Sequence, residues 1–215
     1  MRKLWILLFG IFLLSFQSDN LPNVLIIGDS ISIGYTPYVK KALEGKAHVV
    51  HNPGNAGDTG RGLKSLDNWL DDTQWDIIHF NWGLWDLCYR HPESEVYGNR
   101  DKVNGTVTFS PGEYGENLEK LVIRLKKTGA KLIFATTTYV PRGEAGRKFG
   151  DDKRYNKVAV QVMKEHGIQI NRLNKISRKI HRKHAKSEND VHFTDKGYKK
   201  LADPVVDVIR ENLEN

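Results

Sequence analysis

A serine follows a run of apolar residues near the start of the chain. Residues 23–28 read NVLIIG, and Asp29 and Ser30 come directly after them. A continuous run of branched apolar residues is typical of a strand that is buried on both faces of a parallel sheet. A serine at the mouth of the next helix has its backbone N–H pointing outward, in a helix field that stabilises negative charge. Ser30 is therefore a candidate nucleophile, although Asp and Ser are also ordinary capping residues.

A serine nucleophile needs a general base, which is usually histidine. His192 is the best placed of the eight histidines, because the segment NDVHFTDKGY (189–198) leads into the last predicted helix. Such a loop can return to the sheet edge where the first strand ends. The other seven lie in a Lys/Arg-rich helix, in or beside strands, in a long loop or at a helix end. Read alone, His192 fits a surface or capping histidine equally well.

The elements that must position these side chains alternate between short strands and longer amphipathic helices. This alternation predicts one α/β domain over residues 21–215, with a parallel sheet of about five strands covered by helices on both faces. The expected strands are 23–28, 47–52, 76–82, 131–138 and 167–171, and the expected helices are 36–45, 113–129, 152–167, 171–186 and 194–213.

Two long polar stretches, 87–113 and 139–152, follow the carboxyl ends of predicted strands. Ligands bind at that edge of open α/β sheets, and long loops there are more often functional than accidental. This edge holds aromatic rings and guanidinium groups that suit sugar faces and hydroxyls: Trp82, Trp85, Tyr89, Arg90, Tyr97, Arg100, Tyr139 and Arg142. We take Trp85, Arg90 and Arg142 as the substrate-binding candidates and expect several of the rings in the core.

The composition narrows the classes of function. With 39% hydrophobic and 27% charged residues, the chain reads as a folded globular protein. A net charge of +7 permits contact with an anionic polymer or a membrane surface without establishing it, and the basic segment 171–186 reads as a solvated helix face. Cys88 is the only cysteine, which excludes an intrachain disulfide and a thiolate metal cluster. We predict no metal, no cofactor and no nucleic-acid partner.

The first twenty residues have the pattern of a secretory signal. Arg2 and Lys3 precede an apolar run from Leu4 to Phe16, which is too short for a comfortable membrane span. No clear small-residue cleavage motif follows, so an uncleaved anchor is the alternative. We therefore expect an exported protein, periplasmic or extracellular, whose contact with a membrane is confined to this segment.

Four segments of the sequence resemble, in order, the motif blocks of the SGNH or GDSL-type hydrolases. They are Gly28-Asp29-Ser30, NPGNAGDTG (52–60), NWGLWD (81–86) and Asp190-Val191-His192. The resemblance implies a flavodoxin-like three-layer α/β/α fold and a serine esterase with Gly57 in the oxyanion hole. The third block has the form FN-x-G-L-x-D, which resembles the third block of esterases in this family that are encoded beside polysaccharide-degrading enzymes. The chain therefore resembles the carbohydrate-esterase-like members.

Two positions depart from the family pattern. Trp85 stands where the third block usually has an asparagine that donates to the oxyanion, so Asn81 or the Trp85 indole must replace it, and Asn81 is favoured. Asn189 occupies the usual position of the acid, three residues before His192. Either Asp190 or a backbone carbonyl must then orient His192, and Asp190 is favoured.

The resemblance and these residues together define an expected reaction. Ser30 attacks an ester carbonyl, His192 transfers the proton, and Asp190 orients His192, while Ser30, Gly57 and Asn81 stabilise the oxyanion. The polar, loop-rich edge favours a short acyl group, most simply O-acetyl, on a carbohydrate. The alternatives are a lysophospholipase or thioesterase and a non-catalytic carbohydrate-binding protein on the same fold. The sequence leaves the oligomeric state undetermined.

Overall fold

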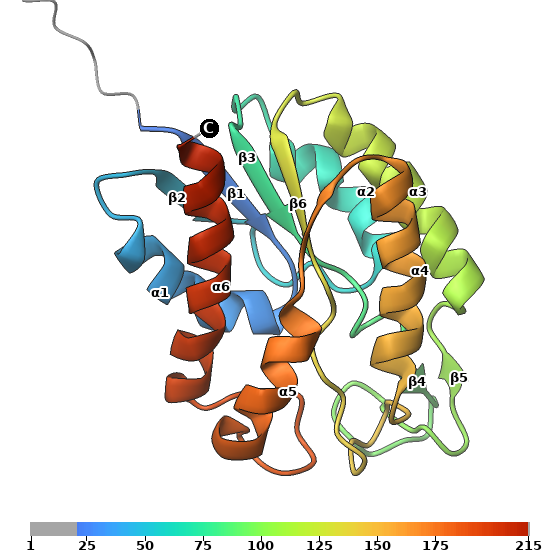
Figure 1. Cartoon of the computed structure of the whole chain (residues 1–215). Coiled ribbons are helices and arrows are strands. Elements are labelled where there is room, and N and C mark those ends of the chain that lie inside the picture. The colour runs from blue at the N-terminus through green and yellow to red at the C-terminus, as the bar shows by residue number, and fades with distance from the viewer. Residues whose placement is uncertain (1–20, 215) are drawn as a thin grey trace, which may run out of the picture.

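The computed structural model describes residues 21–214, which form a parallel five-stranded sheet between two layers of helices (Figure 1). The strand order is β2-β1-β3-β6-β7 and all four pairings are parallel. The strands are β1 (Asn23–Ile27), β2 (His48–His51), β3 (Ile77–Phe80), β6 (Lys131–Ala135) and β7 (Gln169–Asn171). The predicted three-layer α/β/α fold is confirmed.

The described residues contain six helices. They are α1 (Ser30–Ala42), α2 (Thr59–Leu70), α3 (Pro111–Lys126), α4 (Asp151–Glu165), α5 (Leu173–His184) and α6 (Asp195–Leu213). Figure 1 shows α1 and α6 on one side of the sheet and α2, α3 and α4 on the other. The carboxyl ends of the strands point to the lower end of that view, where α5 and the long loops lie.

The core explains why the strands read as continuous apolar runs. All four residues of β3 are buried, and so are Val24 to Ile27 of β1, because helices cover both faces of the sheet. The polar exception is His79 of β3, whose Nε2 lies 3.3 Å from the Asn171 amide nitrogen. Burial lowers the pKa of His79 to about 4, so this histidine is neutral and structural.

Helix α2 was not predicted from the sequence, and its first turns contain Gly60 and Gly62, residues of low helix propensity. A Cβ atom on Gly62 would lie only 2.7 Å from the Trp82 ring, so this glycine lets the helix approach a buried indole closely. The helix begins after Asp58, whose side chain accepts a hydrogen bond from the Arg61 N–H. Tertiary packing therefore outweighs the low helix propensity of glycine here.

The two long loops are joined to each other. The first contains a short antiparallel pair, β4 (Tyr89–Arg90) and β5 (Thr106–Val107), that the sequence did not predict. Its backbone bonds to the second loop at two points, Tyr89 N–H to Gly146 at 2.7 Å and Lys102 N–H to Ala145 at 2.9 Å. These contacts make the loops one connected wall beside the sheet edge.

The predicted signal segment, residues 1–20, lies outside the described residues. Among residues 21–214, no helix has the length and apolar character needed to cross a membrane.

Candidate active site

Ser30 is the first residue of α1, directly after the turn that leaves β1. Asp29 is the N-cap, and its buried carboxylate accepts a hydrogen bond from the Ile31 N–H at 2.9 Å. The N–H of Gly28 donates to the Asn52 side chain at 2.9 Å, which fixes the other side of the turn. Burial raises the pKa of Asp29, although the hydrogen bond from the Ile31 N–H and the charge of nearby Arg147 both lower it. Asp29 therefore shapes the turn, and Ser30 projects from it.

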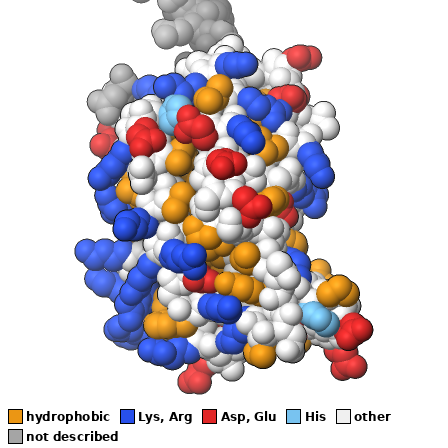
Figure 2. Space-filling model, turned by 90° about the vertical axis from the view of Figure 1, so that its right-hand side faces the viewer, with side chains coloured by type: hydrophobic (Ala, Val, Ile, Leu, Met, Phe, Trp, Pro, Cys, Tyr) orange, Lys and Arg blue, Asp and Glu red, His pale blue; other side chains and the backbone are white. Residues whose placement is uncertain are grey.

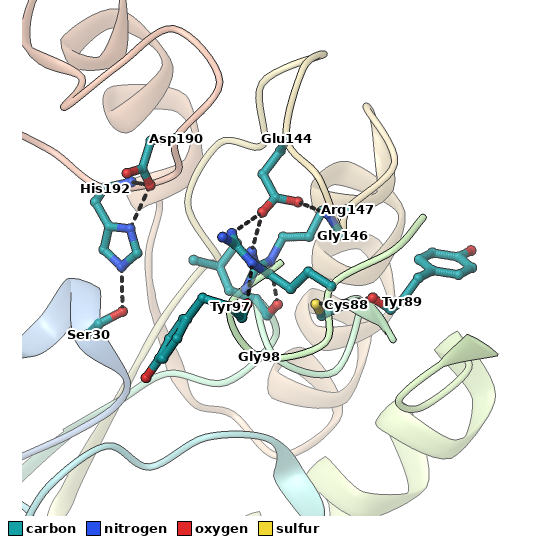
Figure 3. A network of polar contacts seen from close by, with 12 residues as sticks. Ser30, Cys88, Tyr89, Tyr97, Gly98, Glu144, Gly146, Arg147, Asp190 and His192 are labelled. Atoms are coloured by element: carbon teal, nitrogen blue, oxygen red, sulfur yellow. Dashed lines mark hydrogen bonds and ion pairs between the residues drawn. The ribbon is translucent and has the colours of Figure 1, made fainter. Parts of the chain in front are cut away.

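A chain of hydrogen bonds links Ser30, His192 and Asp190 (Figure 3). Ser30 Oγ lies 2.9 Å from His192 Nε2, and His192 Nδ1 lies 2.6 Å from Asp190 Oδ1. The same Asp190 oxygen accepts the His192 backbone N–H at 3.0 Å. Because a carboxylate only accepts, the proton sits on Nδ1 and leaves Nε2 free to accept the Ser30 hydroxyl proton.

The loop between α5 and α6 brings His192 to this edge. Val191 and Phe193 on either side of it are buried, and the Lys186 N–H donates to the His192 carbonyl at 2.9 Å. His181 of α5 contacts the Asp190 carbonyl through Nε2 at 2.8 Å. The histidine and its carboxylate are thus held by α5 and by the loop that follows it.

Asp190 remains ionised in this setting. Partial burial raises its pKa, but hydrogen bonds from the backbone and ring of His192 lower the pKa more, so the pKa of Asp190 lies below its usual range. Asn189, at the family's usual acid position, points elsewhere: its side chain packs against Gly143, where a Cβ atom would lie 1.8 Å from the amide oxygen.

The second motif block lies beside the serine. Gly57 has a φ of +62°, which favours glycine, and its N–H donates to the Asn55 side-chain oxygen at 2.8 Å. Because the Gly57 N–H is a donor, the Asn55 atom that it contacts is the oxygen Oδ1. The Asn55 amide nitrogen has no partner among the described residues. Asn55 lines the same cavity as Ser30 and His192.

The other oxyanion candidates are placed differently. Asn81 donates its amide to the Ala135 carbonyl at 2.6 Å, which ties the end of β3 to the end of β6, and it does not line the cavity around Ser30. Trp85 does line that cavity, with the Arg90 guanidinium 4.8 Å from the centre of its ring. Arg142 lies in a neighbouring groove, with its guanidinium 4.0 Å from the Phe149 ring centre.

The cavity itself is small and polar on one side. Its volume is about 320 Å³, at the low end for a small-molecule site. Ser30, Asn55, Trp85 and His192 form part of its wall. The joined loops contribute Arg90, Tyr97, Arg100 and Arg147, and the α5–α6 loop contributes Lys186 and Asp190 besides His192.

The sequence matches the model of the GDSL-like Lipase/Acylhydrolase family over residues 26–200. The chain belongs to this family. It is therefore a GDSL-type serine ester hydrolase, as the four motif blocks predicted. A search of the curated proteins finds no match.

Solved structures agree with this hydrolase in fold. An acetyl xylan esterase, AlAXEase, has 15% identity and a TM-score of 0.69, with 87% of this chain and 99% of that chain covered. A lipase/acylhydrolase from Enterococcus faecalis has 20% identity and a TM-score of 0.70, with coverage of 89% and 96%. A catalytic mutant of Axe2, an acetylxylan esterase from Geobacillus stearothermophilus, has 16% identity and a TM-score of 0.71, with coverage of 87% and 94%.

Asp86, the last residue of the third block, is a buried residue that ties two elements of this hydrolase together. Its buried Oδ1 accepts bonds from the Thr59 N–H at 2.9 Å and the Thr59 hydroxyl at 2.5 Å. It therefore connects the start of α2 to the loop after β3. Burial raises the pKa of Asp86 to about 7, and the bonds from Thr59 moderate the rise.

Sequence reasoning missed Asn55, Glu144, Arg147 and Lys186. Asn55 lies inside the second block, and a polar side chain two residues before the oxyanion-hole glycine was a usable signal. Glu144 and Arg147 lie in the loop 139–152, which was flagged as a whole. No sequence pattern distinguishes these two from the other charged residues of that loop.

Proposed function

We propose that this hydrolase removes short acyl groups, in the first place O-acetyl, from carbohydrate through an acyl-enzyme. The observation that supports it most is the continuous Ser30–His192–Asp190 chain opening onto a small cavity. The acetyl xylan esterases among the structures of similar fold support the acetyl group and the sugar.

The reaction uses the proton arrangement of the site. Ser30 Oγ attacks the ester carbonyl while its proton moves to His192 Nε2, and Asp190 stabilises the imidazolium that forms. His192 returns that proton to the oxygen of the leaving alcohol, so the C–O ester bond breaks and Ser30 holds the acyl group. Water then attacks the acyl-enzyme, gives its proton to Nε2, and releases the carboxylic acid and Ser30.

The oxyanion needs donors aimed at it. The Ser30 N–H is the first amide of α1, which a helix leaves without an intrahelical partner. We assign the side-chain donor to the Asn55 amide nitrogen, in place of Asn81, because the Asn81 amide is bonded to Ala135. Gly57 then acts as a positioning residue, since its N–H holds the Asn55 oxygen.

The cavity favours a short acyl group over a long one. A lysophospholipase or long-chain thioesterase needs an extended apolar channel, whereas this wall combines Trp85 and Tyr97 with arginines. Tyr97 is 90% exposed, and the Arg90 guanidinium lies over one face of the Trp85 ring. Exposed rings of this kind suit the apolar face of a sugar. The unbroken triad argues against a purely binding role.

We also propose that the protein is exported, on the signal-like pattern of residues 1–20. An extracellular or periplasmic site would bring the hydrolase to polysaccharide.

The test is acetate release from acetylated xylan and acetylated oligosaccharides by the wild type, Ser30→Ala and Ser32→Ala. Ser32 is a matched control: it is buried two residues away, and its hydroxyl contacts His51 Nε2 at 2.7 Å rather than the cavity. We expect release by the wild type and Ser32→Ala, and none by Ser30→Ala. Equal release by Ser30→Ala, or hydrolysis of long-chain esters alone, would overturn the proposal.

A further inference from the structure

The wall opposite Ser30 contains a buried ion-pair cluster. Glu144 is 0% exposed, and its Oε1 accepts from Arg100 at 2.5 Å and from Arg147 at 2.9 Å (Figure 3). Its second oxygen, Oε2, accepts the Gly146 N–H at 2.7 Å. One carboxylate therefore serves two guanidinium groups, and both arginines also line the cavity with Ser30.

Each of these arginines keeps an unused donor. Arg147 bonds through Nε to the Leu84 carbonyl at 2.7 Å and through Nη1 to Glu144. Arg100 bonds through Nε to the Tyr97 carbonyl at 3.0 Å and through Nη1 to Glu144. In both, Nη2 has no partner among the described residues. Arg147 is only 5% exposed, yet it lines the cavity, as Arg100 does.

Two further cations stand around the same cavity. Arg90 donates to the Gly98 carbonyl and lies over the Trp85 ring, and no carboxylate pairs with it among the described residues. Lys186 also lines the cavity and forms no ion pair there among those residues. The three arginines with Glu144 thus have two positive charges in excess, before Lys186 is counted.

The two acidic residues that line the cavity, Asp29 and Asp190, offset part of this charge, but neither forms an ion pair with these cations among the described residues. Asp29 is buried and bonded to the Ile31 N–H, and Asp190 is bonded to His192. A guanidinium is planar and presents paired N–H donors that match a carboxylate. A cavity with several such donors and no carboxylate left for them is suited to an anionic ligand.

We infer that the physiological substrate is an O-acetylated acidic sugar, whose ring carboxylate is bound by Arg90, Arg100 and Arg147 while its acetyl ester reaches Ser30. This inference rests on the proposed function and specifies its substrate class. Tyr97, whose carbonyl holds Arg100, lies beside Gly98 in the same wall and provides an exposed ring for the sugar face (Figure 3).

The outer surface is consistent with an acidic polysaccharide. Helix α5 contains Lys175, Arg178, Lys179, Arg182 and Lys183 and no acidic residue. Figure 2 shows Lys and Arg side chains crowded along one lower edge of the molecule. The α5–α6 loop that carries Lys186 and His192 connects this helix to the cavity. A polyanionic chain would meet positive charge both in the cavity and on α5.

The test compares acetate release from O-acetylated glucuronic acid and O-acetylated glucose, which differ at C6 as carboxylate and hydroxymethyl. For the wild type we expect kcat/KM to be at least about tenfold higher on the acidic sugar, with a preference that shrinks as salt screens the charges. A hemisuccinate ester of glucose places the carboxylate on the acyl group instead. It should be a poorer substrate than the acidic acetyl sugar.

Variants separate binding from folding. Arg90→Gln removes a rim cation outside the Glu144 cluster and should lose about tenfold on the acidic sugar and clearly less on the neutral one. Arg154→Gln is the charge-matched control, because Arg154 is an exposed α4 residue outside the cavity; it should change neither. Equal kcat/KM on both sugars, preference for the hemisuccinate, or equal losses in Arg90→Gln would overturn the inference while the esterase stands. No hydrolysis of any sugar ester would overturn the proposed function itself.

Discussion

Replacing Asp190 by Asn tests how the acid of this site works. In the structure one oxygen, Oδ1, accepts both the His192 backbone N–H and the Nδ1 proton. An asparagine can present its carbonyl oxygen to the same two donors, so the productive tautomer of His192 is kept. What the substitution removes is the negative charge beside the imidazolium.

The expected loss follows from that charge. Two unit charges about 4 Å apart at an effective dielectric constant near 20 interact by about 4 kcal/mol. The Asp190 side chain is 28% exposed, and solvent reduces this figure to about 2–3 kcal/mol, which is roughly 30- to 150-fold in rate. Stabilising the wrong tautomer of the histidine, by contrast, lowers kcat about 10⁴-fold in serine proteases.

The assay is kcat on 4-nitrophenyl acetate for the wild type, Asp190→Asn and Asn189→Ala. Asn189 is the matched control, since it precedes Asp190 and packs against Gly143 rather than His192. It should stay within about threefold of the wild type, as surface changes usually do. A loss below tenfold in Asp190→Asn would show that a backbone group orients the histidine, and a loss near 10⁴ would show that the amide is turned the other way.

Three further outcomes follow from the contacts described above. Asn55→Asp keeps the acceptor for the Gly57 N–H but removes the donor, so kcat for 4-nitrophenyl acetate should fall about 10²–10³-fold. Asn81→Ala should lose far less. A larger loss in Asn81→Ala than in Asn55→Asp would return the donor role to Asn81. The pKa of Asp86 is about 7 in the folded protein and near 3.8 in the unfolded chain, so the free energy of unfolding should fall by up to about 4 kcal/mol as pH rises from 4 to 7. Urea titrations at several pH values should show this pH dependence in the wild type and a flatter one in Asp86→Asn. An unchanged pH dependence in the variant would contradict the assignment. Gly62→Ala should destabilise the fold by about 1–3 kcal/mol in thermal unfolding, because its Cβ meets the Trp82 ring, and an unchanged Tm would show that the ring moves aside.

The fold could be predicted because the strands are buried on both faces. Their continuous apolar runs, interrupted by amphipathic helices, specify a parallel sheet without further information. Helix α2 was not predicted, because it depends on contacts between residues distant in sequence. Gly62 packs against the Trp82 ring, and no local sequence pattern reveals that contact. The strand pair β4–β5 was not predicted because each strand is only two residues long.

The candidate site was predictable where its geometry is local. Ser30 follows its strand directly, and Asp190 reaches His192 across two residues of the same loop. The arginine wall was not predictable, because Glu144 and Arg100 are 44 residues apart and meet only through the joined loops. Asn81 was favoured for its place at a strand end, and the Ala135 carbonyl that engages its amide lies on another strand.

The measurement that tests the central claim most directly is the site of acylation. The wild type is mixed with 4-nitrophenyl acetate, quenched in acid within milliseconds, and digested for mass spectrometry. The structure predicts one acetyl group on Ser30, absent from Ser30→Ala and still on Ser30 in Ser32→Ala. Acetylation of another residue, or unimpaired hydrolysis by Ser30→Ala, would contradict the assignment of Ser30 as the nucleophile of this hydrolase.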